Sequence, residues 1–435
     1  MSNYGDRENM QEGIETIIDA VRKHHELYKN ALPLIASENI TSPTVRVLLA
    51  SDFSHRYAEG DVGNRFYQGC KYIDTVEALA IRYAEELFEA EHVNVKPISG
   101  VNANIAALFA LTLPGDKIAA LSVPDGGHIS HSRYSVPAIR NLKLGELPFD
   151  QNEMNIDTDK MVKGIKEKKP KLILLGASLF LFPHPVREAR EAADEVDARI
   201  VYDASHVLGL IAGKKFQDPL REGADVVTSS THKTFPGPQG AIILCKETLK
   251  DKIDKAVFPG TVSNHHLHHV AGLAVTLAEM KHFSAEYALQ ILSNAKALAQ
   301  GLYEEGFNVL CEHKGFTESH QIAVDVRGGY GGGDAVAKKL EKANIITNKN
   351  MLPFDKMPEE PSGIRLGVQE LTRLGMKESE MREIASFIRR VVIEKEDETK
   401  IKEEIMELRK DFQRVQYCFD GKKIESIYKE QEQEI

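Results

Sequence analysis

The middle of the chain, from about residue 116 to residue 245, alternates short apolar runs with segments of helical periodicity. The apolar runs are residues 117–121, 172–175, 200–202, 226–227 and 241–244. Strands that alternate with helices are typical of βαβ units, in which parallel strands form one sheet and helices cover it. The pattern therefore predicts an α/β protein with a mostly parallel sheet.

The chain before residue 116 predicts mostly helix. Residues 1–30 have the pattern of an amphipathic helix that could clasp a second subunit. Its apolar positions are Ile14, Ile17, Ile18 and Val21. A second helix is predicted over 74–90, and the polar stretch 34–43 between the two has no period, which is typical of a loop that carries function.

The chain from about residue 285 predicts a smaller α/β unit. Helices are expected from about residue 285 and over 377–412, and strands over 322–326 and 362–367. The glycine-rich residues 328–333 predict a turn, with Asp334 as the cap of the following helix. We therefore expect an N-terminal segment (1–55), a large domain (56–284) and a smaller C-terminal domain (285–435).

Polar side chains follow several of the predicted strands directly. They are residues 125–128, Ser178, residues 203–206 and residues 229–233. In open parallel sheets, ligands bind at the edge formed by the carboxyl ends of the strands. Four polar sets at one edge predict a binding site there.

Lys233 follows a run of hydroxyl residues at the end of one of these strands. A lysine in this place is either a solvated loop cation or an amine held at the rim of a pocket, and the local residues leave both open. No glycine run precedes it, so the phosphate-binding Walker loop is absent. In a pocket, neighbouring dipoles and partial burial would suit this amine to Schiff-base chemistry.

Three further positions are candidates for the same site. Asp203 ends an apolar run, so its carboxylate is either a partner for a buried cation such as a pyridinium or a helix cap. Ser99 and Gly100 begin a predicted helix, where free N–H groups favour a phosphate, although serine is also a common N-cap. Arg365 lies between Ile364 and Leu366 on a short strand and faces either a cleft, as a carboxylate clamp, or solvent.

Composition narrows the class of protein. The chain has 435 residues, of which 42% are hydrophobic, and a formal net charge of -10, which argues against a broad nucleic-acid surface. No apolar run approaches the roughly 20 residues of a membrane span, and the amino terminus has no signal pattern. Four separated cysteines suit reduced thiols, so we expect a cytoplasmic protein.

Four histidines between 265 and 269 invite a metal interpretation. Pairs among them could share a helix face, but no nearby cysteine or pair of carboxylates completes a closed zinc site. Packing or a phosphate contact fits them better, so we predict no metal.

From about residue 30 to residue 376, the sequence resembles the serine hydroxymethyltransferase family of pyridoxal-phosphate enzymes. The resemblance depends on residues 34–39, 57–60, 65–67, 99–100, 126–128, 203–206, 231–234, 257–260 and 362–367. It implies the aspartate aminotransferase fold (fold type I), with a sheet of the seven-stranded type and a smaller C-terminal domain. It also implies a homodimer with shared active sites, which converts serine and a reduced pterin to glycine and the methylene-pterin.

The resemblance implies roles for individual residues. Lys233 would bind the cofactor as a Schiff base, Asp203 would keep its pyridine nitrogen protonated, and His128 would stack on its ring. The other implied cofactor contacts are Ser99, Gly100, Ser178, His206, His232 and Tyr57. Arg365 and Ser37 would hold the amino-acid carboxylate, Glu59 would be the acid/base group, and Ser230 would keep a hydroxyl beside the lysine. Tyr57 and Tyr67 would enter from the partner subunit. The implied pterin contacts are Val123, Gly126, Gly127, Ile129 and Asn350.

Three departures from the family pattern affect these implications. Val101 replaces a serine that commonly contacts the phosphate, and residues 261–264 replace a glycine-rich loop that reaches the partner's phosphate. Pro124 and Asp125 replace alanine and histidine beside the pterin, which stiffens the loop and adds a negative charge. A modified pterin such as tetrahydromethanopterin is therefore a candidate acceptor.

Two alternatives remain at this point. One is a pterin-independent pyridoxal-phosphate aldolase of the same fold that acts on 3-hydroxy amino acids. The other is a non-catalytic metal- or ligand-binding protein that has kept the fold, with the histidines at 265–269 as its distinguishing feature.

Overall fold

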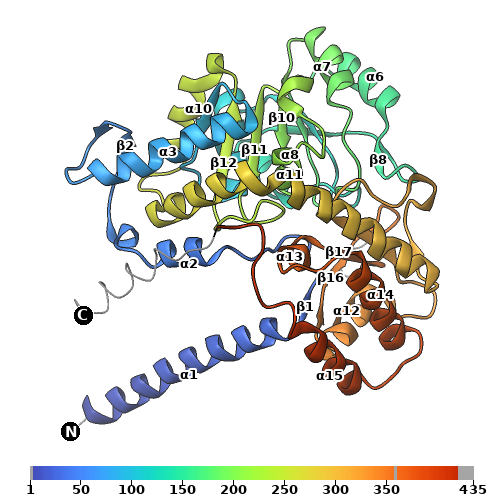
Figure 1. Cartoon of the computed structure of the whole chain (residues 1–435). Coiled ribbons are helices and arrows are strands. Elements are labelled where there is room, and N and C mark those ends of the chain that lie inside the picture. The colour runs from blue at the N-terminus through green and yellow to red at the C-terminus, as the bar shows by residue number, and fades with distance from the viewer. Residues whose placement is uncertain (1–2, 357–359, 420–435) are drawn as a thin grey trace.

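A computed structural model describes residues 3–356 and 360–419 and is built around a seven-stranded sheet (Figure 1). In spatial order the strands are β4 (His92–Asn94), β12 (Ala241–Cys245), β11 (Val226–Ser230), β10 (Arg199–Asp203), β9 (Leu172–Leu175), β5 (Lys117–Ala120) and β6 (Lys143–Glu146). Strand β12 runs antiparallel to both of its neighbours, and the other pairs are parallel. The prediction of a mostly parallel sheet is confirmed.

Two layers of helices bury the two faces of this sheet. The helices that pack on it are α3 (Lys71–Phe88), α4 (Gly100–Leu111), α6 (Thr158–Lys168), α7 (Val186–Asp194), α8 (Leu208–Ala212), α10 (Lys250–Val257) and α11 (Leu267–Glu304). Side chains alternate along a strand, so Leu172 and Leu174 enter the core that contains α4, whereas Ile173 and Leu175 enter the core that contains α3. Burial on both faces explains why these strands are continuous apolar runs in the sequence.

The C-terminal part forms a second, antiparallel sheet. Its strands, in order, are β13 (Asn308–Val309), β14 (Gln321–Asp325), β17 (Gly363–Gly367) and β16 (Asn348–Asn350). Its helices are α12 (Gly332–Lys342), α13 (Gln369–Arg373), α14 (Glu378–Val392) and α15 (Glu398–Arg409). Helix α11 continues without a break through residues 284 and 285, where we expected the domain boundary.

One detail of the predicted C-terminal unit was wrong. Gly331, not Asp334, is the N-cap of α12, because the glycine run reaches the positive φ that the start of this helix requires. Asp334 lies in the first helical turn and forms ion pairs with Lys338 and Lys349. A carboxylate in this place still favours the positive end of the helix dipole.

Helix α1 (Asn3–Lys29) extends away from the rest of the chain (Figure 1). Its predicted apolar stripe is exposed, from 46% at Ile18 to 65% at Ile17. After α1 the chain contacts the C-terminal unit, where β1 (Leu32–Pro33) pairs with β15 (Ile345–Ile346). Helix α2 (Pro43–Leu49) follows. Among the described helices, including the 38-residue α11, none is long and apolar enough to cross a lipid bilayer.

The remaining elements are short. They are β2 (Gly60–Asp61), β3 (Asn64–Arg65), β7 (Phe149–Asp150), β8 (Asn155–Ile156), α5 (Val136–Ile139), α9 (Pro219–Glu222) and four 3-10 turns at Asp52–His55, Ile129–His131, Glu247–Leu249 and Glu312–Lys314.

Candidate active site at the carboxyl ends of the strands

A cavity of about 370 Å³ lies at the carboxyl ends of the central strands. The predicted site residues that line it are Ser37, Ser99, Gly100, His128, Asp203, His206, Ser230, His232 and Lys233. Val101, Asn104, Ala177, Ser205 and Gln239 complete its wall. Segments far apart in the sequence therefore supply one concave polar surface.

Lys233 is buried, with 8% of its surface exposed, three residues after β11 ends. The Asn39 side chain donates a hydrogen bond of 2.5 Å to its carbonyl, and Thr231 Oγ1 donates to Pro238 O at 2.7 Å, which fixes the turn on either side. Burial lowers the pKa of the Lys233 amine to about 8, although the charge of Asp203 raises it. The amine is therefore more nucleophilic at neutral pH than a solvated lysine.

Asp203 is the last residue of β10 and is 6% exposed. Its Oδ2 accepts hydrogen bonds from Asn104 Nδ2 at 2.7 Å and from His131 Nε2 at 3.1 Å, and its Oδ1 accepts from the backbone N–H of Ser205 at 3.0 Å. Burial alone raises the pKa of this carboxyl, but the hydrogen bond and charge of His131, with Asn104, hold it well below its usual range. Asp203 is thus an ionised carboxylate at the cavity wall.

The structure excludes the alternative that Asp203 caps a helix, because α8 begins at Leu208 with Val207 as its N-cap. Sequence reasoning missed both side chains that hold Asp203. A usable signal existed for Asn104, which lies one helical turn after Gly100 on the predicted helix. No local signal links His131 to residue 203.

The amino terminus of α4 forms the third part of the cavity. Ser99 is its N-cap and accepts a hydrogen bond from the backbone N–H of Asn102 at 3.2 Å. A Cβ at Gly100 would lie 2.4 Å from Ser230 Oγ and 3.2 Å from Ser205 Oγ, so a larger residue there would displace the Ser230 hydroxyl. Serine hydroxyls and the first turn of a helix therefore converge, which is the environment that a phosphate prefers.

Two histidines at the cavity are neutral, the half-buried His128 and the buried His206. His128 Nδ1 accepts a hydrogen bond from the backbone N–H of Ser130 at 3.1 Å, and burial lowers the pKa of His128 to about 4. Burial also holds the pKa of His206 well below its usual range. The His206 ring stacks on His320 and lies 2.8 Å from Gln321 Nε2, and neither of these two residues was predicted from the sequence. Neutral rings are suited to stacking and to neutral hydrogen bonds at a cofactor.

Arg365 on β17 is buried, with 8% of its surface exposed, so it does not lie on a solvent face. It is not among the side chains that line the cavity, but its Nη1 donates to Ser178 O at 2.7 Å and its Nη2 to Asn348 Oδ1 at 3.3 Å. Its Nε is buried with no hydrogen-bond partner among the described residues. Burial lowers the pKa of Arg365 to about 10, so the guanidinium stays charged at neutral pH and offers an unused donor to an anion.

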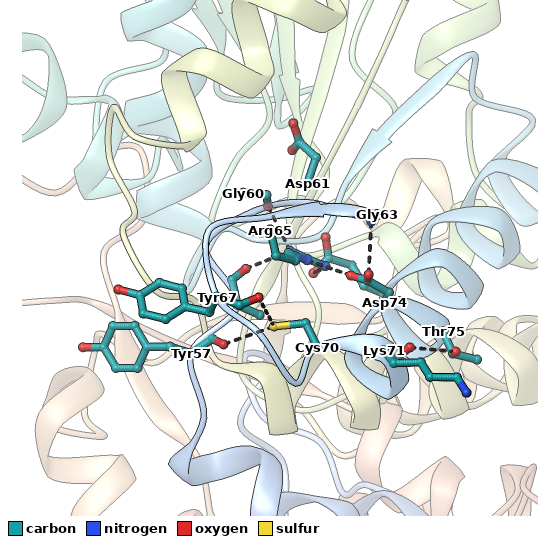
Figure 2. A network of polar contacts seen from close by, with 12 residues as sticks. Tyr57, Gly60, Asp61, Gly63, Arg65, Tyr67, Cys70, Lys71, Asp74 and Thr75 are labelled. Carbon is teal, nitrogen blue, oxygen red and sulfur yellow. Dashed lines mark hydrogen bonds and ion pairs between the residues drawn. The ribbon is translucent and has the colours of Figure 1, made fainter.

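Glu59, Tyr57 and Tyr67 do not line the cavity of their own chain. They lie in the segment between the 3-10 turn Asp52–His55 and α3, where the two tyrosine rings are 5.4 Å apart and point to the same side (Figure 2). Tyr57 is 54% exposed and Tyr67 is 42% exposed. Ser263 Oγ donates a hydrogen bond to Glu59 Oε1. These predicted site residues therefore form a separate, outward-facing group.

Two of the histidines at 265–269 contact other parts of the protein through a ring nitrogen. His265 Nε2 lies 2.8 Å from Glu77 Oε2, and His269 Nδ1 contacts Gln239 O. Within residues 3–356 and 360–419, no group of three or more histidine, cysteine or acidic side chains is arranged to hold a metal ion. The tract packs α11 against α3 and against the turn after Lys233.

The parts of the cavity match the chemistry of pyridoxal phosphate. A buried amine of lowered pKa suits its aldehyde, an ionised carboxylate suits its protonated pyridine nitrogen, and the glycine and hydroxyls at α4 suit its phosphate. With the mostly parallel sheet, these features define a pyridoxal-phosphate-dependent enzyme of fold type I.

Comparison with known proteins identifies the family. The family model described as serine hydroxymethyltransferase matches residues 10–388. Serine hydroxymethyltransferases of Methanocella arvoryzae and Methanopyrus kandleri are 62% and 60% identical to this chain, over 94% of it and over 97% and 96% of their own lengths. That of Methanocaldococcus jannaschii is 60% identical over 93% of this chain and 95% of its own. The chain belongs to the serine hydroxymethyltransferase family.

A solved structure supports the fold. The L-threonine transaldolase from Pseudomonas fluorescens superposes with a TM-score of 0.88 over 99% of both chains, at 28% identity. This identity is far below that of the serine hydroxymethyltransferases, so it does not favour the alternative of a pterin-independent aldolase. The protein is a pyridoxal-phosphate-dependent transferase that interconverts serine and glycine, and the alternative of a non-catalytic binding protein is dropped.

Proposed function

We propose that the cavity described above holds pyridoxal phosphate and that its residues have the roles that the family resemblance assigns. The observation that carries this proposal is the pairing, in one cavity, of a lysine whose pKa is about 8 with an ionised Asp203. Lys233 binds the cofactor covalently, Asp203 neutralises its pyridinium, and the neutral His128 ring stacks on it. The other cofactor contacts are Ser99, Gly100, Ser178, His206, Ser230, His232 and, from the partner, Tyr57. When bound, the cofactor withdraws electrons from a bond at the substrate Cα.

Arg365 and Ser37 are the proposed contacts of the substrate carboxylate. The backbone on both sides of Ser37 is fixed, because His320 Nε2 lies 3.1 Å from Ala36 O and Gln369 Nε2 donates to Glu38 O at 2.6 Å. Holding the carboxylate in one place would fix the orientation of the substrate Cα and thereby select which of its bonds the cofactor activates. For serine this is the Cα–Cβ bond. Glu59 is the proposed acid/base group.

A reduced pterin is the proposed one-carbon acceptor, with contacts at Val123, Gly126, Gly127, Ile129 and Asn350. The loop at 123–129 is tightly constrained: Gly126 has a φ of +89°, and a Cβ at Gly127 would lie 2.4 Å from Leu121 O. On β16, Asn350 lies on the same side of the strand as Asn348, the partner of Arg365. The loop at 123–129 and Asn350 could thus contact the flat ring of the pterin.

We expect serine cleavage to depend on a pterin and to proceed better with tetrahydromethanopterin than with tetrahydrofolate. Asp125 is half-buried in the proposed pterin loop, where Ser122 Oγ donates to it at 2.7 Å, and it would face the acidic tail of folate. Glycine formation is measured with each carrier and with none. Asp125→Asn should improve kcat/KM for tetrahydrofolate by roughly fivefold, which is about 1 kcal/mol of like-charge repulsion.

Equal or better efficiency of the natural enzyme with tetrahydrofolate would contradict the carrier preference and leave the transferase reaction intact. Full serine turnover without any pterin would contradict the proposal of a pterin acceptor.

A homodimer with shared sites is the proposed active form. Tyr57, Glu59 and Tyr67 lie outside the cavity of their own chain, and the exposed apolar stripe of α1 provides a surface for a second copy. Phe66 and Tyr72, which lie close to Tyr67 in the sequence, are 74% and 70% exposed and add apolar surface. A second subunit would cover these side chains and supply Glu59 to the cavity that contains Lys233.

We expect two inactive variants to restore each other's activity. Co-refolding Glu59→Ala with Lys233→Ala should yield about one quarter of the natural activity, because about half of randomly formed dimers are mixed and each mixed dimer has one intact site. Each variant refolded alone is the control. If mixed dimers are present by mass spectrometry and no activity returns, both residues serve a site within one chain.

A further inference from the structure

A buried network of ion pairs lies beneath the loop that carries Glu59 (Figure 2). At its centre is Glu77 on α3, whose side chain is 2% exposed. Its carboxylate lies 3.0 Å from Arg65 Nη2, 2.8 Å from His265 Nε2 and 3.9 Å from Lys96 Nζ. Burial raises the pKa of Glu77, but His265, Lys96 and Arg65 outweigh it and lower the pKa, so the group is ionised.

Arg65 connects this centre to the backbone around Glu59. Its Nη1 donates to Ala58 O at 2.8 Å and to Gly60 O at 2.9 Å, which are the carbonyls immediately before and after Glu59 (Figure 2). Its Nε donates to Asp74 Oδ1 at 2.7 Å. The five donors of a guanidinium are planar and rigid, so whatever fixes this group also fixes the carbonyls of the two residues that flank Glu59.

Lys96 and His265 connect the same centre to two other segments. Lys96 Nζ, after β4, also donates to Gly60 O at 2.8 Å and so adds a second contact to the carbonyl of the residue after Glu59. His265 follows Asn264, which accepts from the backbone N–H of Ala58 at 3.0 Å. Ser263, the residue before Asn264, contacts the Glu59 carboxylate directly. The buried Glu77 carboxylate is therefore linked to Glu59 by two routes. One runs through Arg65 in the loop that carries Glu59, and the other runs through residues 263–265.

We propose that Glu77 is a positioning residue for the reaction: it holds Arg65 and His265, and through them it fixes the direction in which the Glu59 carboxylate points. This inference rests on the proposed acid/base role of Glu59. Glu77 does not line the cavity that contains Lys233. Its effect on turnover is therefore transmitted by the loop and not by contact with the reactants.

The test is a double-mutant cycle with Glu59→Gln, Glu77→Gln and both changes together. Glutamine keeps the shape of Glu77 but removes the charge that holds Arg65 and His265. We expect kcat to fall roughly 10- to 100-fold for Glu77→Gln, with KM for serine changed by less than about threefold, because small misplacements of a catalytic group act on kcat. If Glu77 acts through Glu59, the double variant should be no slower than Glu59→Gln alone.

A matched control is Asp225→Asn. Asp225 is another carboxylate with a 1% exposed side chain, and it is held by Arg190 at 2.9 Å and Arg199 at 3.0 Å, but it lies at the amino end of β11, away from the cavity. This variant should lower the melting temperature and leave kcat within about twofold. If Glu77→Gln does not fold, Arg65→Lys replaces it in the cycle, because lysine keeps the charge but cannot bridge both carbonyls.

The outcomes separate the two claims. Natural kcat in Glu77→Gln, or losses that multiply in the double variant, would overturn the positioning role. Natural kcat in Glu59→Gln would instead overturn the acid/base role of Glu59 on which it rests.

Discussion

Lys233→Ala is expected to abolish covalent cofactor binding and to reduce serine turnover by roughly a thousandfold or more. Among the buried polar and charged residues within 3–356 and 360–419, the only other lysine is Lys96, which is already bonded to Gly60 O and Asp61, so no neighbouring buried amine can replace Lys233. The measurement is the visible absorbance of the purified protein, followed by borohydride reduction and peptide mapping.

Lys246→Ala is the control for this variant. Lys246 follows β12, pairs with Asp225 and lies at the opposite end of the same pair of strands. The Lys246→Ala variant should keep the full visible absorbance of the cofactor and full serine turnover. Borohydride-fixed cofactor on another lysine of Lys233→Ala, together with full turnover, would show that the central assignment is wrong.

Arg365→Ala is expected to raise KM for serine roughly 30- to 1000-fold. This factor corresponds to a loss of about 2–4 kcal/mol of binding free energy for the substrate carboxylate. The guanidinium is buried and charged, and its Nε has no hydrogen-bond partner among the described residues, so a carboxylate fits the unused donor. Arg365→Lys should recover only part of the loss, because an ammonium lacks the two-pronged geometry. Steady-state kinetics with serine and with glycine measure the effect.

Arg327→Ala is the matched control for Arg365. Arg327 follows β14 of the same small sheet, but its side chain is 55% exposed and pairs with Asp325. Its removal should leave KM for serine unchanged. An unchanged KM in Arg365→Ala itself would show that the carboxylate binds elsewhere.

Much of the fold could be predicted because its signals are local. Continuous apolar runs predicted the buried strands, and β9 to β12 lie where these runs were found. Helices were expected over 377–412, and α14 and α15 lie there. The error at Asp334 arose within two or three residues of a helix start, where glycine conformation and side-chain capping compete.

The residues at the strand ends were also predictable from the sequence. A residue that ends an apolar run in a parallel sheet must lie at the ligand-binding edge, which placed Asp203 and Lys233 together before any contact was known. The same argument explains Ser99 and Gly100, because a strand followed by a helix determines where the free N–H groups lie.

The side chains that control this site were decided only by the tertiary structure. Asn104 and His131 reach Asp203 across 99 and 72 residues, and Gln321 reaches His206 across 115. Arg365 could be assigned to a buried face only after β17 had packed beside Ser178. The sequence by itself therefore determined the elements, the edge of the sheet and the family, because periodicity and strand order are properties of short segments. Packing between distant segments decided the charge of Asp203, the pKa of Lys233 and the support of Glu59 by Glu77, because these depend on which groups share a site without water.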